Sequence, residues 1–163
     1  NNVVQAIVEA YQGAGFTTLR FNFRGVGGSE GTYDNGEGEQ EDVRNALEFL
    51  KQQGSDTLHL AGYSFGAWVN AKMAKDLHDV NKMIMISPPA DFMDFTFVEE
   101  DPKICLVVTG ERDDIAGAAR VEELAAVWNP QVDLHIIPGA DHFYGGYEGE
   151  LRRILGGFLA SAS

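Results

Sequence analysis

Residues 58–74 read LHLAGYSFGAWVNAKMA. The first part, LHLAGY, is a short apolar run typical of a strand, and AWVNAKMA consists mainly of residues that favour a helix. Between them, GYSFG matches the pattern G-x-S-x-G of a nucleophile elbow, in which a serine lies on a sharp turn from strand to helix. The stretch therefore predicts a strand–turn–helix unit with Ser64 exposed at the turn.

A second match to the same pattern, GGSEG, occurs at residues 27–31. Ser29 follows a β-rich run, but the residues after it, EGTYDNG, do not readily begin a helix. The chain contains 19 glycines, so one chance match is no surprise. Only Ser64 has the strand before it and the helix after it. We expect Gly62 and Gly66 to leave room where the turn packs against its neighbours.

Apolar periodicity predicts strands that alternate with helices along the chain. Such alternation favours a parallel sheet that helices cover on both faces, with ligands bound at the carboxyl ends of the strands. The predicted strands are FTTLRFNF (16–23), DTLHLAGYS (56–64), KMIMIS (82–87), KICLVVTG (103–110) and VDLHIIP (132–138), and the predicted helices are 1–13, 39–53, 67–77, 120–128 and 151–159.

The 163 residues, 44% of them hydrophobic, are enough for one well-buried core and too few for two, so we expect a single domain. The net charge of −13 predicts that most of the surface repels polyanions, so neither nucleic acid nor an anionic membrane is an expected partner.

A single cysteine, Cys105, excludes an intrachain disulfide and favours a reducing compartment, which makes the cytoplasm the expected location.

A serine nucleophile needs a base, and the base needs a third group that orients it. His142 lies in PGADHFYGG, directly after the last predicted strand, and is the expected base. Three other histidines lie within predicted strands or after a predicted helix: His59, His78 and His135. We expect each of them to be a structural or a surface residue. Asp113 and Asp114 follow the preceding strand in VVTGERDD, and both remain candidates for the acid.

Four stretches in this order resemble the α/β-hydrolase superfamily: RFNFRGVGGSEG (20–31), GYSFG (62–66), GERDD (110–114) and GADHF (139–143). They resemble, in turn, the strand and loop before the elbow, the elbow itself, the acid loop and the histidine loop. Within the superfamily the chain is similar to small bacterial serine hydrolases without a cap domain, in the dienelactone-hydrolase-like group. The resemblance covers essentially the whole chain and implies an α/β-hydrolase fold.

The resemblance also implies roles for individual residues. The acid of the family is the third residue after the glycine of its loop, here Asp113, with Asp114 as the fallback, while Asp141 is expected only to shape the histidine loop. Dienelactone hydrolase itself has cysteine at the elbow, so the serine at position 64 argues against that particular activity. The implied reaction is hydrolysis of a small carboxylic ester or thioester through an acyl-enzyme, without cofactor or metal.

The oxyanion hole of such an enzyme takes one N–H from the residue after the nucleophile, here Phe65, and one from the loop before the first helix. Nothing in the chain precedes the helix that begins at Asn1 and Asn2, and the chain does not start with methionine. The resemblance places a further strand between FTTLRFNF and DTLHLAG in the sheet. We therefore expect a fragment that lacks its N-terminal strands and the second oxyanion donor.

The connection SPPADFMDFTFVEEDP (87–102) is too short for a lid domain, so we expect an open site. Its apolar residues Phe92, Met93, Phe95 and Phe97 are candidates either for a substrate pocket or for plain packing.

Two other functions compete with the hydrolase. A dinucleotide-binding loop at residues 25–31 is disfavoured because Glu30 stands where the third glycine of G-x-G-x-x-G belongs and no helix is expected to open there. In the hydrolase interpretation, Arg24 beside this loop is expected to pair with a carboxylate. A non-catalytic interaction module on a hydrolase fold is the remaining alternative, because fold alone does not determine function.

Overall fold

A computed structural model describes residues 1–161 of the chain. The strands form one parallel sheet in the order β1-β2-β3-β4, which confirms the predicted parallel architecture. The elements are α1 (Asn2–Gly13), α2 (Glu37–Gln52), β1 (His59–Tyr63), α3 (Phe65–Met73), the 3₁₀ turn η1 (Ala74–Asp76), β2 (Lys82–Ile86), β3 (Ile104–Gly110), α4 (Ala118–Trp128), β4 (Asp133–Ile137) and α5 (Glu148–Ser161).

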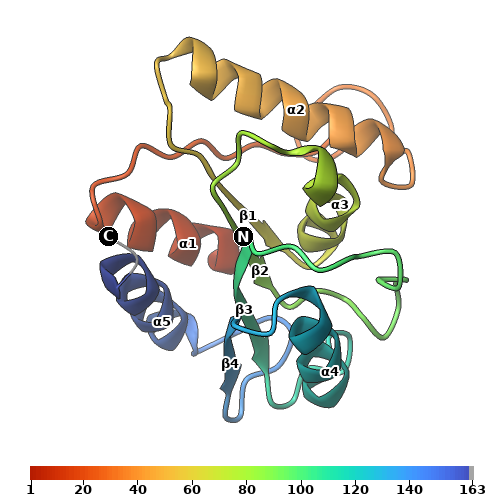
Figure 1. The fold of residues 1–163 in the computed structure, drawn as a ribbon, viewed down its shortest axis with the longest axis vertical. Coiled ribbons are helices and arrows are strands. Elements are labelled where there is room, and N and C mark those ends of the chain that lie inside the picture. Colours follow the sequence, from red (N-terminus) through yellow and green to blue (C-terminus); the bar gives the residue numbers. More distant parts are fainter. Residues whose placement is uncertain (162–163) are drawn as a thin grey trace.

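Helices cover both faces of this sheet (Figure 1). The helices α1 and α5 lie together on one face, while α3 and α4 lie on the other, with α2 packed beside α3. A sheet that is buried on both faces requires apolar side chains on both sides of its strands. The run KMIMI of β2 meets this requirement, because four of its five residues are buried.

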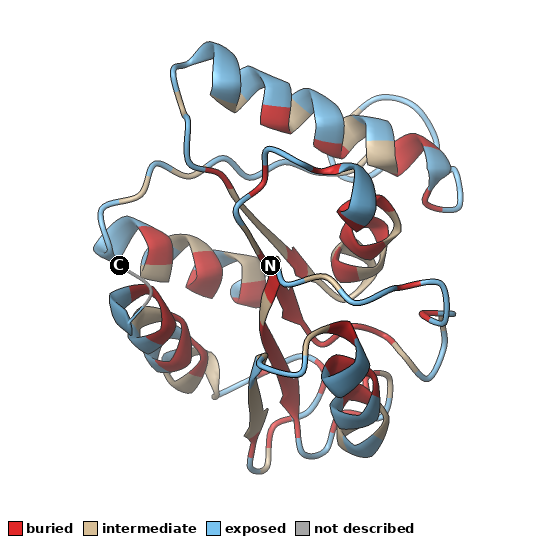
Figure 2. Ribbon diagram, in the orientation of Figure 1, coloured by how far each residue is buried: buried red, intermediate tan, exposed pale blue. Residues whose placement is uncertain are grey.

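Alternate side chains of β2 point into two separate cores, as strand geometry dictates. Met83 and Met85 join the cluster beneath α3 and α4, whereas Ile84 and Ile86 join the cluster beneath α1 and α5. The buried residues on each helix accordingly face the sheet in Figure 2, and the exposed ones face solvent.

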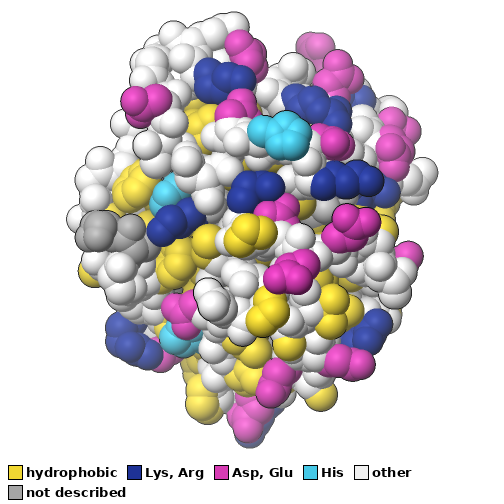
Figure 3. All heavy atoms as spheres, in the orientation of Figure 1, with side chains coloured by type: hydrophobic (Ala, Val, Ile, Leu, Met, Phe, Trp, Pro, Cys, Tyr) yellow, Lys and Arg dark blue, Asp and Glu magenta, His cyan; other side chains and the backbone are white. Residues whose placement is uncertain are grey.

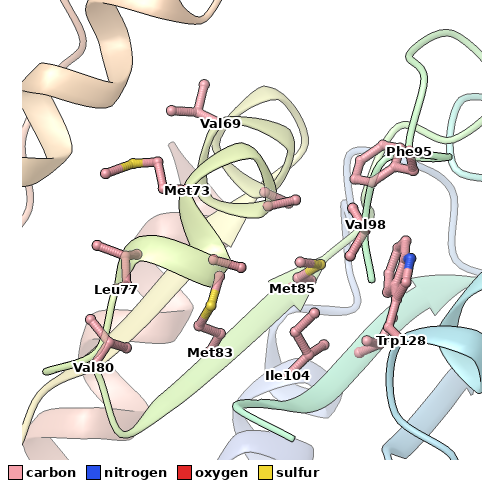
Figure 4. Close-up of a cluster of buried hydrophobic side chains, with 14 of the residues drawn as sticks. Val69, Met73, Leu77, Val80, Met83, Met85, Phe95, Val98, Ile104 and Trp128 are labelled. Atoms are coloured by element: carbon pink, nitrogen blue, oxygen red, sulfur yellow. The ribbon is translucent and has the colours of Figure 1, made fainter. Parts of the chain in front are cut away.

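Trp128 is the largest fully buried side chain in the first of these cores (Figure 4). Its ring packs on Phe95, with the ring centroids 5.4 Å apart. We expect Trp128→Ala to lower the free energy of unfolding by about 3–5 kcal/mol, because it removes a large buried ring and leaves a cavity. Urea unfolding would measure this loss. Val127→Ala, at a neighbouring position that is 60% exposed, is the control and should change stability little.

The predicted strand at residues 16–23 is not a strand of the sheet, although its residues are rich in β-formers. The physical reason is the lack of a partner: within residues 1–161, β1 pairs only with β2, and its other edge is free. A groove of about 460 Å³ lies between the run and β1. Apolar side chains line much of it, among them Ile7, Phe16, Val43 and Leu60. The groove lies where the family resemblance implies a further strand, and that strand stays a prediction.

The ends of the helices follow local capping chemistry and differ by a few residues from the sequence-based prediction. Asn1 caps α1 by accepting hydrogen bonds from the N–H groups of Val3 and Val4. The second helix begins at Glu37 rather than at Glu39, because the buried Glu39 carboxylate accepts the N–H of Gly36 and closes the first turn.

Acidic side chains are spread over the face seen in Figure 3, several of them beside lysine or arginine. Arg24 pairs with Asp42 at 2.9 Å, which confirms the expectation that it binds a carboxylate. The hydrogen bond from Arg24 holds the pKa of Asp42 below its usual value. Among residues 1–161, no helix combines the length and apolarity needed to cross a bilayer.

Candidate active site

Ser64 lies on a sharp turn between β1 and α3, as predicted. Its backbone has φ 53° and ψ −118°, a conformation that is rare for a residue with a side chain. The turn is held by the hydrogen bond from the Ser64 N–H to the Ile86 carbonyl, at 2.9 Å. The serine is therefore presented at the carboxyl end of β1.

Gly62 is required for this turn because α3 approaches the strand closely. A Cβ atom at Gly62 would lie 2.6 Å from Asn70 Nδ2 and 2.7 Å from the Ala67 nitrogen, closer than real contacts allow. Gly66 differs, because the nearest neighbour of an added Cβ is a ring atom of Phe23 at 3.7 Å, an ordinary contact. The expectation that a glycine is needed for close packing therefore holds at Gly62, whereas at Gly66 there is room for a Cβ atom.

His142 lies in the loop that follows β4. Asp141 shapes this loop, as expected, by accepting the N–H groups of Phe143 and Tyr144. The Tyr63 hydroxyl donates to the His142 carbonyl at 2.8 Å, and burial together with the nearby carboxylates raises the pKa of Tyr63 to about 12. At the other side, Asn2 donates to the Phe143 carbonyl at 2.8 Å and so ties the start of α1 to the loop.

Asp113 lies in the loop after β3, and its side chain has no exposed surface. One carboxylate oxygen, Oδ1, accepts the backbone N–H groups of Ile115 and Ala116 at 2.9 and 2.7 Å. Burial alone would raise the pKa of Asp113, but the hydrogen bonds that it accepts, above all from His142, lower the pKa below its ordinary value. Asp113 is therefore a buried carboxylate that is stable in its charged form.

These three side chains meet at the carboxyl edge of the sheet. Ser64 Oγ lies 2.8 Å from His142 Nε2, and His142 Nδ1 lies 2.9 Å from Asp113 Oδ2. A carboxylate has no proton to donate, so Nδ1 must carry the ring proton. In the neutral ring, Nε2 is then unprotonated and faces the Ser64 hydroxyl as an acceptor. This arrangement can remove a proton from Ser64 and stabilise the resulting imidazolium.

The competing residues do not join this group of three side chains. Ser29 donates to the Asn22 carbonyl, and no helix begins directly after it, since α2 starts at Glu37. His59 contacts the Tyr11 hydroxyl at 3.0 Å, and His135 pairs with Asp133 in β4. His78 and Asp114 are exposed.

Phe65, the expected oxyanion donor, is the first residue of α3. Its backbone N–H belongs to the first turn of the helix, where N–H groups have no acceptor within the helix. The N-terminus of a helix also carries partial positive charge, which favours an anion. The group is therefore suited to bind a developing oxyanion next to Ser64.

Some of the large apolar residues in the connection before β3 pack in the core, and the others are exposed. Phe95 is buried against Trp128 and Met93 packs against the same core, so both serve the fold. Phe92 and Phe97 are 73% and 42% exposed. Closer to Ser64, the ring of Phe65 packs against Phe23, Tyr33 and Trp68, an aromatic group that sequence reasoning did not identify.

Sequence reasoning also missed two buried hydroxyls behind Asp113. Ser87 donates to Asp113 Oδ2 at 2.7 Å, and Tyr144 lies 2.6 Å from the Ser87 hydroxyl. A signal was present for both. Ser87 is the first residue after β2, at the same edge of the sheet, and Tyr144 is two positions after His142.

Comparison with known proteins supports the fold. Residues 2–104 match the family model described as alpha/beta hydrolase fold. A protein of Rickettsia prowazekii, described only as uncharacterized, is 36% identical over 154 residues, and the match covers 88% of this chain. The chain spans 65% of the length of that relative.

Two solved structures are similar over nearly the whole chain. A structure from Coxiella burnetii, described as an alpha-beta serine hydrolase homologue, has 36% identity and a TM-score of 0.90, covering 98% of this chain and 76% of its own. A structure from Xanthomonas campestris, described as an α/β serine hydrolase without a lid, has the same identity and TM-score and covers 99% of this chain and 73% of its own. With its parallel sheet, its serine elbow and these relatives, the chain belongs to the α/β-hydrolase fold family.

Proposed function

We propose that the protein is a serine hydrolase that cleaves a small carboxylic ester or thioester, with Ser64 as nucleophile, His142 as base and Asp113 as the acid that orients it. One observation carries the proposal: Ser64 Oγ, the His142 ring and the buried Asp113 carboxylate are joined by hydrogen bonds of 2.8 and 2.9 Å. A serine that is held in a strained turn and hydrogen-bonded to an oriented imidazole is an activated nucleophile.

The reaction has two halves. Ser64 Oγ attacks the acyl carbon while its proton moves to His142 Nε2, and the backbone N–H of Phe65 binds the oxyanion. The tetrahedral intermediate collapses, His142 gives the proton to the departing alkoxide or thiolate, and the acyl group stays on Ser64. Water, deprotonated by His142, then attacks the acyl-enzyme, and release of the carboxylic acid restores the serine hydroxyl.

Substrate size and setting form part of the proposal. The connection between β2 and β3 is too short for a lid domain, which favours small esters that need no lid to hold them. The chemistry of the three side chains requires neither cofactor nor metal. The acidic composition disfavours nucleic acid and anionic membranes as partners, and the single half-buried cysteine, Cys105, favours the cytoplasm.

A fluorophosphonate probe tests the proposal directly, because it forms a covalent bond only with an activated serine. We expect the intact natural protein to gain the mass of one probe and peptide mapping to place it on Ser64. The Ser64→Ala variant should gain none, while Ser29→Ala should label normally. A folded wild-type protein that takes up no probe, or takes it up at another residue, would contradict the proposal and favour the non-catalytic interaction module.

A further inference from the structure

A pair of buried hydroxyl groups, on Ser87 and Tyr144, lies next to the Asp113 carboxylate. Ser87 Oγ is 2.7 Å from Asp113 Oδ2, and Tyr144 Oη is 2.6 Å from Ser87 Oγ. Both residues have no exposed surface. Water therefore does not reach either hydroxyl, and their hydrogen bonds are made within the protein.

The chemistry of the groups determines which atom donates in each hydrogen bond. The charged Asp113 carboxylate can only accept, so the Ser87 hydroxyl must donate its single proton to Oδ2. Ser87 Oγ then has no proton for Tyr144 and must accept one from the Tyr144 hydroxyl. The result is a one-way chain from Tyr144 through Ser87 to Asp113, which continues through His142 to Ser64.

Several of the residues joined by these hydrogen bonds have an unusual backbone conformation. Among residues 1–161, four residues other than glycine have positive φ: Asn35, Ser64, Ser87 and Tyr144. Three of these four belong to the hydrogen-bonded chain, with φ of 53°, 47° and 59° for Ser64, Ser87 and Tyr144. Such conformations cost free energy, persist where the surroundings enforce them, and cluster at functional sites.

Ser87 is also fixed to the sheet between the nucleophile and the acid. Its N–H donates to the Val108 carbonyl of β3 at 2.7 Å, and the carbonyl of its neighbour Ile86 accepts the Ser64 N–H at 2.9 Å. The serine is thus anchored to both neighbouring strand ends, which gives its hydroxyl a fixed direction toward Asp113.

We propose that Ser87 and Tyr144 are positioning residues that hold the Asp113 carboxylate in the orientation in which both its oxygens face His142 Nδ1. Backbone N–H groups fix Oδ1. Apart from the histidine, the donor to Oδ2 among the described residues is Ser87. Without it, Oδ2 would have to be satisfied by His142 alone. The expected effect on kcat rests on the proposed function of the Ser64 site. The expected effect on the hydrogen bond between Asp113 and His142 does not.

The kinetic test compares Ser87→Ala with Ser87→Gly. Both remove the hydroxyl, but glycine tolerates the positive φ, so a defect caused only by backbone strain would be smaller in the glycine variant. We expect both to lower kcat about tenfold, equivalent to about 1.4 kcal/mol, with KM little changed, because an acid that only orients the base affects the transition state. A fall confined to Ser87→Ala, or a change confined to KM, would overturn the inference.

A spectroscopic test needs no activity. The proton between His142 Nδ1 and Asp113 gives its own proton NMR signal. Loss of the Ser87 donor lets the carboxylate turn away from Nδ1, so this hydrogen bond should weaken and the signal should move upfield in both Ser87 variants. The titratable groups that face Asp113 are His142, Tyr144 and Tyr63. The spectra are therefore recorded at one neutral pH, where both tyrosines, whose pKa values are raised, keep their protons.

Tyr144→Phe should move the same signal in the same direction but less. In this variant Ser87 still donates to Asp113, but its hydroxyl is a weaker donor because the Tyr144 hydroxyl no longer polarises it. Tyr11→Phe is the matched control, since Tyr11 is another buried tyrosine whose hydroxyl bonds to a side chain, His59, away from Asp113. The control should leave the signal at its wild-type position. A signal that stays at that position in folded Ser87→Ala and Ser87→Gly would overturn the inference.

The two tests also separate this inference from the proposed function. If the wild-type protein hydrolyses no ester and takes up no fluorophosphonate, while the NMR signal moves as expected, the proposed function fails and the positioning role stands. If the wild-type protein is active and the signal does not respond to either Ser87 variant, the function stands and the positioning role fails.

Discussion

Replacing Ser64 with alanine is expected to lower ester hydrolysis by roughly 10⁶-fold, because the nucleophile and its base act as a unit and the loss of either removes the covalent step. His142→Ala should cause a loss of similar size for the same reason. The measurement is the initial rate on an aryl ester, with the folded state of each variant checked by circular dichroism.

Ser29→Ala is the matched control for this experiment, since it removes the serine of the other G-x-S-x-G match. Its hydroxyl donates to the Asn22 carbonyl in a surface loop, so full activity should remain. If Ser29→Ala were inactive and Ser64→Ala active, the assignment of the nucleophile would be wrong.

Replacing Asp113 with asparagine is expected to lower kcat by about 10⁴-fold with little change in KM. The amide has no charge to stabilise the imidazolium. Its NH₂ group, if it faces Nδ1, would also drive the histidine into the tautomer that cannot accept the Ser64 proton. Kinetics of the purified variant on the same aryl ester would measure the loss.

Asp114→Asn is the control for Asp113→Asn, because Asp114 is the exposed neighbour that the sequence alone left as a candidate acid. Its activity should stay close to that of the wild-type protein. A large loss at Asp114 together with a small loss at Asp113 would reverse the assignment.

The lowered pKa of Asp113 gives the same variant a second readout in stability. A carboxylate whose pKa is lower in the folded protein stabilises the fold above its ordinary pKa of 3.8, and this contribution is lost as the pH falls through the folded pKa. Asparagine does not titrate. The stability of Asp113→Asn should therefore fall less steeply with acidification below that pH than the stability of the wild-type protein.

The sequence predicted the layers of the fold well because each element carries a local signal. The run KMIMI is apolar throughout, as a strand buried on both faces must be, and the helices show their apolar face at regular spacing. The run 16–23 shows the limit of this reasoning. Its residues favour a strand, but a strand also needs a neighbour, and pairing depends on residues far away in the chain.

The sequence was also sufficient to predict the three main side chains of the candidate site. Ser64, Asp113 and His142 each follow a strand, and in a parallel sheet the ends of successive strands meet at one edge. Ser87 follows a strand in the same way, which places it at the same edge, but nothing in the sequence shows which group its hydroxyl binds. Its role depends on its distance to Asp113 and on the Tyr144 hydroxyl behind it, which only the folded structure displays.

The placement of one residue of the candidate site after each strand has a consequence for how the site assembles. Ser64, Ser87, Asp113 and His142 follow β1, β2, β3 and β4 in that order, and the serine and histidine in contact are 78 positions apart in the chain. Contacts between such distant residues form late, since the loops between them must close first. Helices form locally and early, so a refolding chain regains its helical content before it regains a working nucleophile. Formation of the contact between Ser64 and His142 therefore marks the completion of the whole sheet rather than of any part of it.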